Sequence, residues 1–175
     1  MVRKACMANP GKATPTPPQD LSQSFQRLAE SANRLNKASD ELSRAIGPIE
    51  AVFKKLNLGI AKWHVFFGPF PDQDGDYHQL EIGYAKMGGK WCIALAEESG
   101  NVHASDPDYG SRTSWAFNDA PRQLRIRAVK EIPKLLEALV EEADKVTSEL
   151  EVETRRAQEV GETLTTLAAT SGVRR

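Results

Sequence analysis

Apolar residues recur at alternating intervals of four and three along residues 21–56. Of the eleven positions in this series, ten are apolar, and the exception is Ser39. The positions are Leu21, Phe25, Leu28, Ala32, Leu35, Ser39, Leu42, Ile46, Ile49, Phe53 and Leu56. Because a 3.5-residue period over five heptads keeps one side of a helix facing a neighbour, the series predicts a long helix with an apolar stripe. Asp20, followed by Gln23, resembles a capping box and predicts that the helix begins at residue 20.

A second series with the same spacing lies near the end of the chain. It is interrupted only by Glu153, and its members are Leu139, Ala143, Val146, Leu150, Glu153, Ala157, Val160, Leu164 and Leu167. The capping residue Asn118, followed by Pro121, predicts the entry of this second helix, which we expect over residues 119–168. Each predicted helix contains an interior proline, Pro48 or Pro133, where a missing amide and a ring clash should produce a kink.

The two prolines lie opposite each other if the two helices pair antiparallel. In that register the facing pairs are Leu42 with Leu139, Leu35 with Val146, Leu21 with Val160, Phe25 with Ala157, and Ala32 with Leu150. Residues 21–56 carry a net charge of +2 and residues 134–162 a net charge of −5, which favours the same pairing. We therefore expect a long antiparallel helical hairpin, a coiled-coil-like stalk within one chain. Heptad patterns rarely identify the partner, so pairing between two chains remains the alternative.

The segment between the helices, residues 57–118, has the pattern of a β-meander. Three antiparallel strands are predicted at residues 60–67, 77–87 and 90–97, and Gly88-Gly89 is a strong two-residue hairpin signal between the last two. This turn sets the register, in which Lys86 faces Trp91, Tyr84 faces Ile93 and Ile82 faces Leu95. For the first strand we expect Val65 opposite Leu80, Trp63 opposite Ile82, and His64 opposite Glu81 on the polar face. Residues 98–114 are predicted to be a long polar loop.

The expected fold is therefore α+β, with a three-stranded head inserted between the two helices of the hairpin. The Pro-rich residues 1–19 bury too little apolar surface to offset the entropy of ordering, and they are predicted to be a disordered tail. The first long helix covers residues 20–56, the head 57–118, the second long helix 119–168, and a frayed tail 169–175.

The amino-acid composition is that of a globular protein and argues against several classes of partner. The hydrophobic share of 40% and the charged share of 27% are those of a globular chain, and the net charge of −1 provides no general attraction to nucleic acid or to an anionic membrane. No apolar run approaches the roughly 20 residues that a membrane helix requires. The two cysteines, Cys6 and Cys92, are too few for a disulfide framework, and we interpret them as reduced thiols of a cytoplasmic protein.

The motifs that could carry metal or catalytic chemistry are incomplete. Residues 72–76 alternate aspartates, but the sixth and twelfth positions of a calcium loop, which need Gly and Glu, hold Tyr77 and Gly83. The spacing of the three histidines matches no zinc pattern, and Cys92 lies in a strand without the local signature of a nucleophile. We therefore predict a protein that is not an enzyme and has no metal and no cofactor.

The predicted second helix begins with a cluster of basic residues, namely Arg122, Arg125, Arg127 and Lys130. Arg122 and Arg125 are three residues apart and are expected to share one flank of the helix. Such a flank suits phosphate contacts to nucleic acid, but it also suits a solvated helix face paired with the acidic loops. The second interpretation is favoured because the chain has no basic excess.

Long amphipathic helices and a small head with polar loops suit protein contacts better than catalysis. The predicted function is that of a non-enzymatic intracellular interaction or regulatory protein, whose partner is a protein or a second copy of itself. The residues expected to contact the partner are Arg122, Arg125 and Lys130 of the basic helix, His64 and Phe66 of the exposed strand face, and Tyr109 of the long loop. The alternatives are a nucleic-acid-binding protein that uses residues 122–130, and a small enzyme with an unrecognised site at Cys92 or His64.

Overall fold

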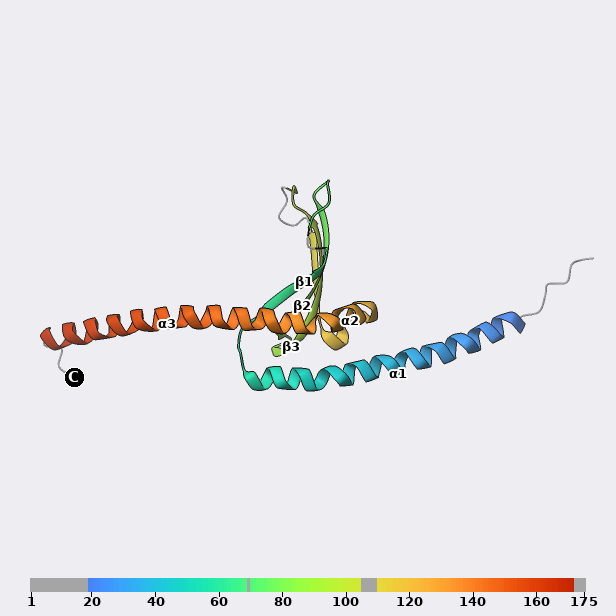
Figure 1. The fold of residues 1–175 in the computed structure, drawn as a ribbon, viewed down its shortest axis with the longest axis horizontal. Helices are drawn as coiled ribbons and strands as arrows, with labels where there is room; N and C mark the ends of the chain where they lie inside the picture. The colour runs from blue at the N-terminus through green and yellow to red at the C-terminus, as the bar shows by residue number, and fades with distance from the viewer. Residues whose placement is uncertain (1–18, 69, 105–109, 172–175) are drawn as a thin grey trace, which may run out of the picture. The chain divides into compact units, whose positions relative to one another are not determined.

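The structure is a computed structural model, and it describes residues 19–68, 70–104 and 110–171 (Figure 1). The predicted tail at residues 1–19 lies almost entirely outside this range, as does Tyr109. The chain divides into two units, Met1–Glu41 and Leu42–Arg175. In the first unit, the described residues form the first part of the helix α1, which spans Gln19–Leu56. The second unit contains the remainder of α1 and all other elements.

A four-stranded antiparallel sheet forms the centre of the second unit. Its strands are β1 (Lys62–Phe67), β2 (Asp76–Met87), β3 (Lys90–Asn101) and β4 (Gly110–Ala116), and they neighbour one another in chain order. The prediction of three strands was wrong, because part of the predicted polar loop at residues 98–114 pairs as the end of β3 and as β4. The strand β4 was missed because its polar sequence, GSRTSWA, lacks the apolar alternation by which strands are recognised.

The hairpin of β2 and β3 has the predicted register. Lys86 faces Trp91, Tyr84 faces Ile93, and Ile82 faces Leu95. Gly88 and Gly89 form the turn with φ angles of 55° and 83°, which only glycine adopts without strain. The turn residues and the apolar alternation therefore specify the same pairing.

The predicted register of β1 was wrong by one residue. Val65 faces Glu81 rather than Leu80, and His64 faces Ile82 rather than Glu81. A β-bulge between Val65 and Phe67 brings Phe67 opposite Leu80, and the sequence pattern does not reveal this extra residue. Because strand side chains alternate between faces, the shift places every side chain of β1 before the bulge on the opposite face from the one predicted.

The core lies where helices pack against one face of the sheet, as Figure 1 shows for α1 and α3. After the 3-10 turn η1 (Phe117–Asp119), the chain continues as α2 (Arg122–Ala128), the 3-10 turn η2 (Val129–Glu131) and α3 (Ile132–Thr170). The largest fully buried side chains are those of Tyr84, Phe117, Ile46, Ile82, Ile93, Leu95, Leu135 and Leu139. Two polar contacts add to this packing: Glu50 of α1 accepts a hydrogen bond from the Ile93 amide at 3.1 Å, and Lys62 of β1 binds Glu142 of α3 at 2.7 Å.

The prediction of a long antiparallel helical hairpin was also wrong. From Leu42 onward, α1 runs in the same direction as α3 (Figure 1), and both helices pack against the sheet. Several of the apolar residues predicted to face each other are exposed, for example Leu21 at 74% and Val160 at 58%. A heptad stripe packs equally well against a sheet or a helix, so its period did not identify the neighbour. No helix in the described ranges combines the length and apolarity that crossing a membrane requires.

Candidate functional site

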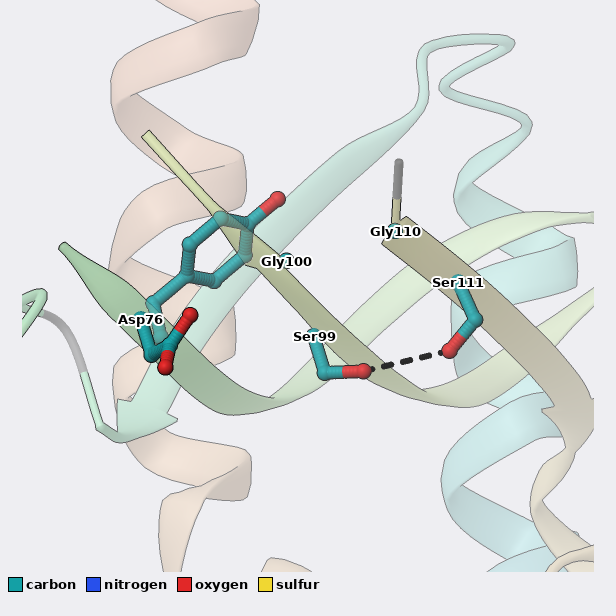
Figure 2. Close-up of a pocket in the computed structure, with 6 residues that line it drawn as sticks. Asp76, Ser99, Gly100, Gly110 and Ser111 are labelled. Carbon is teal, nitrogen blue, oxygen red and sulfur yellow. Dashed lines mark hydrogen bonds between the residues drawn. The ribbon is translucent and has the colours of Figure 1, made fainter. Parts of the chain in front are cut away.

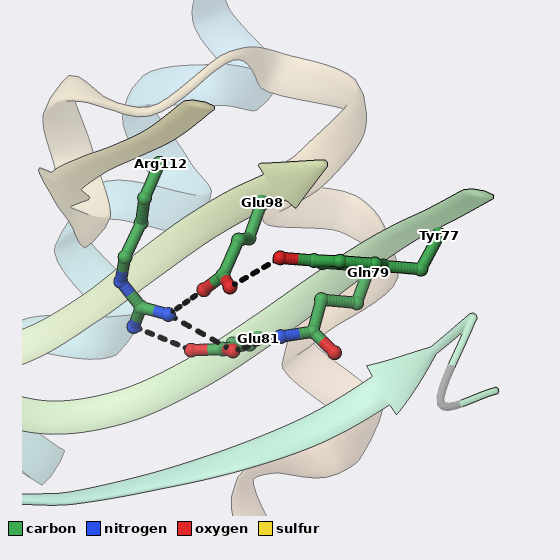
Figure 3. A network of polar contacts seen from close by, with 5 residues as sticks. All are labelled: Tyr77, Gln79, Glu81, Glu98 and Arg112. Atoms are coloured by element: carbon green, nitrogen blue, oxygen red, sulfur yellow. Dashed lines mark hydrogen bonds and ion pairs between the residues drawn. The ribbon is translucent and has the colours of Figure 1, made fainter. Parts of the chain in front are cut away.

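A network of charged and polar side chains lies on the second face of the sheet, the face opposite Ile82 and Ile93. Glu81 of β2, Glu98 of β3 and Arg112 of β4 meet there (Figure 3), because Glu98 and Arg112 are directly paired across the two strands. Arg112 donates from Nη1 to Glu81 Oε1 at 3.1 Å and from Nη2 to Glu81 Oε2 at 2.5 Å. Arg112 also donates to Glu98. Gln79 completes the network by donating to Glu81 Oε1 at 2.8 Å.

The charged groups of this network form their hydrogen bonds with one another. Glu81 is only 4% exposed, and the guanidinium of Arg112 lies over the ring of Trp63, 4.9 Å from its centroid. Hydrogen bonds to Glu81 are the main reason why the pKa of Arg112 is raised above its ordinary value. The hydroxyl of Tyr77 donates to Glu98 at 3.2 Å, and desolvation followed by this contact raises the pKa of Tyr77. With both carboxylates bound by cationic or neutral donors, the arrangement stabilises the sheet and holds no free general base.

An open pocket of about 430 Å³ lies beside Tyr77 at the end of the sheet (Figure 2). Its lining consists of Asp76, Tyr77, Ser99, Gly100, Gly110 and Ser111. The hydroxyls of Ser99 and Ser111 bind each other at 3.1 Å, and Asp76 accepts a hydrogen bond from Asn101 at 2.7 Å. None of the six lining residues that the structure describes is a histidine or cysteine.

The aspartate-rich loop uses its side chains to hold its own backbone. Asp72 Oδ1 accepts hydrogen bonds from the amides of Asp74 at 3.0 Å and Asp76 at 2.9 Å. Across the described part of the chain, no three His, Cys, Asp or Glu side chains converge in a way that could hold a metal ion.

The basic residues of α2 and η2 do not form one surface. Arg125 is buried, at 6% exposed, and donates to Ser43 Oγ of α1 at 3.1 Å. Arg122 is exposed, Arg127 lies 4.4 Å from the ring centroid of Phe67, and the Lys130 ammonium is 3.8 Å from Glu131. The expectation that Arg122 and Arg125 share an accessible flank was wrong, because Arg125 belongs to the buried side of the helix.

The two strand residues predicted to face a partner are partly buried. His64 lies on the helix side of the sheet, with its Nε2 atom 4.0 Å from Glu131 Oε2, and Phe66 packs against the core. The exposed aromatic residue of β1 is instead Phe67, which contacts Arg127 and packs edge-on against His78. The β-bulge explains why the sequence pattern missed it. Tyr109, the remaining predicted contact, lies outside the described residues.

Cys92 does not have the surroundings of a reactive thiol. Its side chain is buried, and the desolvation that results is the main cause of a pKa raised above the ordinary value for a thiol. Because the thiolate is the nucleophilic form, this environment disfavours covalent chemistry at Cys92.

Two exposed apolar stripes are the most prominent surface feature of the described chain. The α1 stripe comprises Leu21, Phe25, Leu28 and Leu35, with exposed fractions of 74%, 70%, 65% and 49%. The α3 stripe comprises Leu150, Val160, Leu164 and Leu167, which are 54–62% exposed. Each stripe continues the heptad series whose other members, Ile46 and Phe53 in α1 and Leu139 in α3, lie in the core. Exposed apolar side chains that share one side of a helix mark a candidate site of interaction.

Comparisons of the chain with protein-family models, with curated proteins and with solved structures gave no match.

Proposed function

We propose that the protein is a non-enzymatic interaction protein of the cell interior, and that its α1 and α3 stripes bind a helical segment of a partner protein. The observation that carries this proposal is the exposure of eight large apolar side chains at heptad spacing on two helices. Helices with such stripes pair by inserting each apolar side chain between side chains of the neighbouring helix.

The contacts of the ionisable groups support a non-enzymatic role. Glu81 and Glu98 are bound by Arg112, while His64 and Glu131 lie near each other against the core. The buried free thiol of Cys92 supports a reducing compartment, where such thiols persist.

The proposal is tested by capturing partners from lysate of the source cell with charged stripe variants. One bait carries Leu28→Glu with Leu35→Glu, and a second carries Leu150→Glu with Leu164→Glu. The matched controls add the same charge beside the stripes, through Gln26→Glu with Asn33→Glu and through Gln158→Glu with Thr165→Glu, at positions that are also exposed. Circular dichroism verifies that all five baits are equally folded.

We expect partner proteins to be retained by the unaltered bait and by the controls, and to be lost from the stripe variants. Nuclease treatment of the lysate removes proteins that are held through nucleic acid. Partners that bind all baits equally, or no specifically retained protein at all, would contradict a role for the stripes.

A further inference from the structure

We infer that the partner of each stripe is a second copy of the chain, with the α1 stripe of one copy paired antiparallel to the α3 stripe of the other. This inference rests on the proposed function, since it identifies the helical segment that the stripes bind. Two copies supply two stripes of each kind, so that two reciprocal contacts close a dimer and cover the α1 stripe together with Leu150 and Val160 of the α3 stripe.

The directions of the two helices favour pairing between copies over pairing within one copy. From Leu42 onward α1 runs in the same direction as α3 in Figure 1, so the antiparallel pairing that the sequences favour is not available there within one copy. In a second copy related by a two-fold axis perpendicular to the helices, the helix directions are reversed. The complementary side chains then meet between copies, where Ala32 lies against Leu150 and Phe25 against Ala157, each pair joining one large side chain to one small one.

The net charges of the two helices also favour pairing α1 with α3. Residues 21–39 contain three basic side chains (Arg27, Arg34 and Lys37) and one acidic side chain (Glu30), whereas residues 142–160 contain six acidic and three basic side chains. Pairing α1 with α1, or α3 with α3, would bring together segments of like net charge. Pairing α1 with α3 brings together segments of opposite net charge, which favours this combination over both alternatives.

The side chains next to the α1 stripe leave room for a second helix. The heptad positions that flank it are occupied by small or uncharged residues, namely Ser24, Ala29, Ser31, Asn36 and Ala38. Such flanks allow a second helix to approach closely and present no carboxylate to the acidic α3.

Mass and crosslinking test the inference on the purified chain. Light scattering after size-exclusion chromatography is expected to give twice the mass of the chain. The double variant Leu28→Glu with Leu35→Glu is expected to raise the dissociation constant of the dimer at least about a hundredfold, because two buried leucines are lost. The control variant Gln26→Glu with Asn33→Glu should stay dimeric.

Crosslinking identifies which stripes meet. In a Cys6→Ser background, a chain with Ala32→Cys is mixed with a longer, tagged chain that carries Leu150→Cys, and the mixture is oxidised with oxidised glutathione. We expect a disulfide-linked heterodimer whose size distinguishes it from either homodimer. Replacing the second variant by Leu164→Cys, which is out of register, should abolish it.

Several outcomes would overturn the inference. They are a monomer at every concentration, a mass that grows without limit, and homodimers of the Ala32→Cys or Leu150→Cys chain in place of the heterodimer. A monomer whose stripes still retain a different protein from lysate refutes self-pairing and leaves the proposed function standing. A dimer that the stripe charges do not weaken refutes both.

Discussion

The guanidinium of Arg112 and the buried carboxylate of Glu81 are joined by two hydrogen bonds, of 3.1 Å and 2.5 Å, across β2 and β4. These strands are not neighbours, because β3 lies between them. The pair therefore connects β2, which is easy to recognise from the sequence, with β4, which is not. Its removal should lower the stability of the whole sheet.

Arg112→Met is expected to lower the free energy of unfolding by about 2–3 kcal/mol, because it leaves the carboxylate of Glu81 buried without its cation. The double variant with Glu81→Met should lose less than the single variant, since two apolar side chains replace both charges. Urea denaturation measures both. If Arg112→Met were as stable as the unaltered chain, the network would not stabilise the sheet.

Gly83 of β2 lies against the ring of Trp63, and this contact leaves no space for a side chain. A Cβ atom at Gly83 would lie 2.5 Å from Trp63 Cε3 and 2.8 Å from the carbonyl oxygen of Lys62. Gly83→Ala should therefore displace Trp63 from beneath Arg112 and cost about 1–3 kcal/mol in thermal or urea unfolding. Gly161→Ala is the matched control, because nothing lies within 4 Å of that position in α3 and alanine favours a helix by about 1 kcal/mol. Equal stability of the two variants would refute the steric argument.

Glu131 provides a prediction about pH. Its pKa is lowered chiefly by the ammonium of Lys134, which forms an ion pair with Oε2 at 2.9 Å, with further contributions from Lys130 and His64. A carboxyl group whose pKa is lower in the folded state stabilises the fold above its unfolded pKa, and this contribution is lost as the pH falls through the folded pKa. Glu131→Gln should therefore destabilise the protein by about 1–2 kcal/mol at neutral pH.

The difference between the unaltered chain and Glu131→Gln should shrink as the pH falls below the ordinary carboxyl value of 4.5. Urea unfolding of both proteins over a series of pH values measures this difference. The exposed carboxylate of Glu137 provides the control, through Glu137→Gln. A difference that stays constant down to acid pH would show that the charge of Glu131 does not contribute to stability.

The parts of the fold that could be predicted from the sequence are those specified by local chemistry. Gly88 and Gly89 specified the turn and register of β2 and β3, and the heptad series predicted both long helices. The partners of the stripes could not be predicted, because side chains of the same period pack against the sheet near Ile46 and lie exposed near Leu28. The register of β1 with β2 was missed because a bulge adds a residue without changing the composition of the strand.

The polar network was not predictable for a related reason. Glu98 and Arg112 become neighbours only if β4 is recognised, and β4 has no apolar alternation. Arg125 was predicted to share one flank of the helix with Arg122, yet its guanidinium reaches Ser43 of α1 from the buried side of α2. Which helix face is buried depends on tertiary packing, and three-residue spacing alone did not determine it.

Glu153 is the one charged residue in the heptad series of α3, and in the proposed dimer it lies opposite Leu28 of the second copy. In the single chain it binds Arg156 of its own helix at 2.6 Å, an exposed pair of small energetic value. Glu153→Leu would extend the apolar surface across this gap, so we expect the dissociation constant of the dimer to fall about tenfold or more. Sedimentation over a range of concentrations measures this constant, and Glu162→Leu, on the side of α3 away from the stripe, is the control for added hydrophobicity. If Glu153→Leu and Glu162→Leu lowered the dissociation constant equally, the effect would be nonspecific. If Glu153→Leu raised the dissociation constant, residue 153 would face solvent or a cation instead of Leu28.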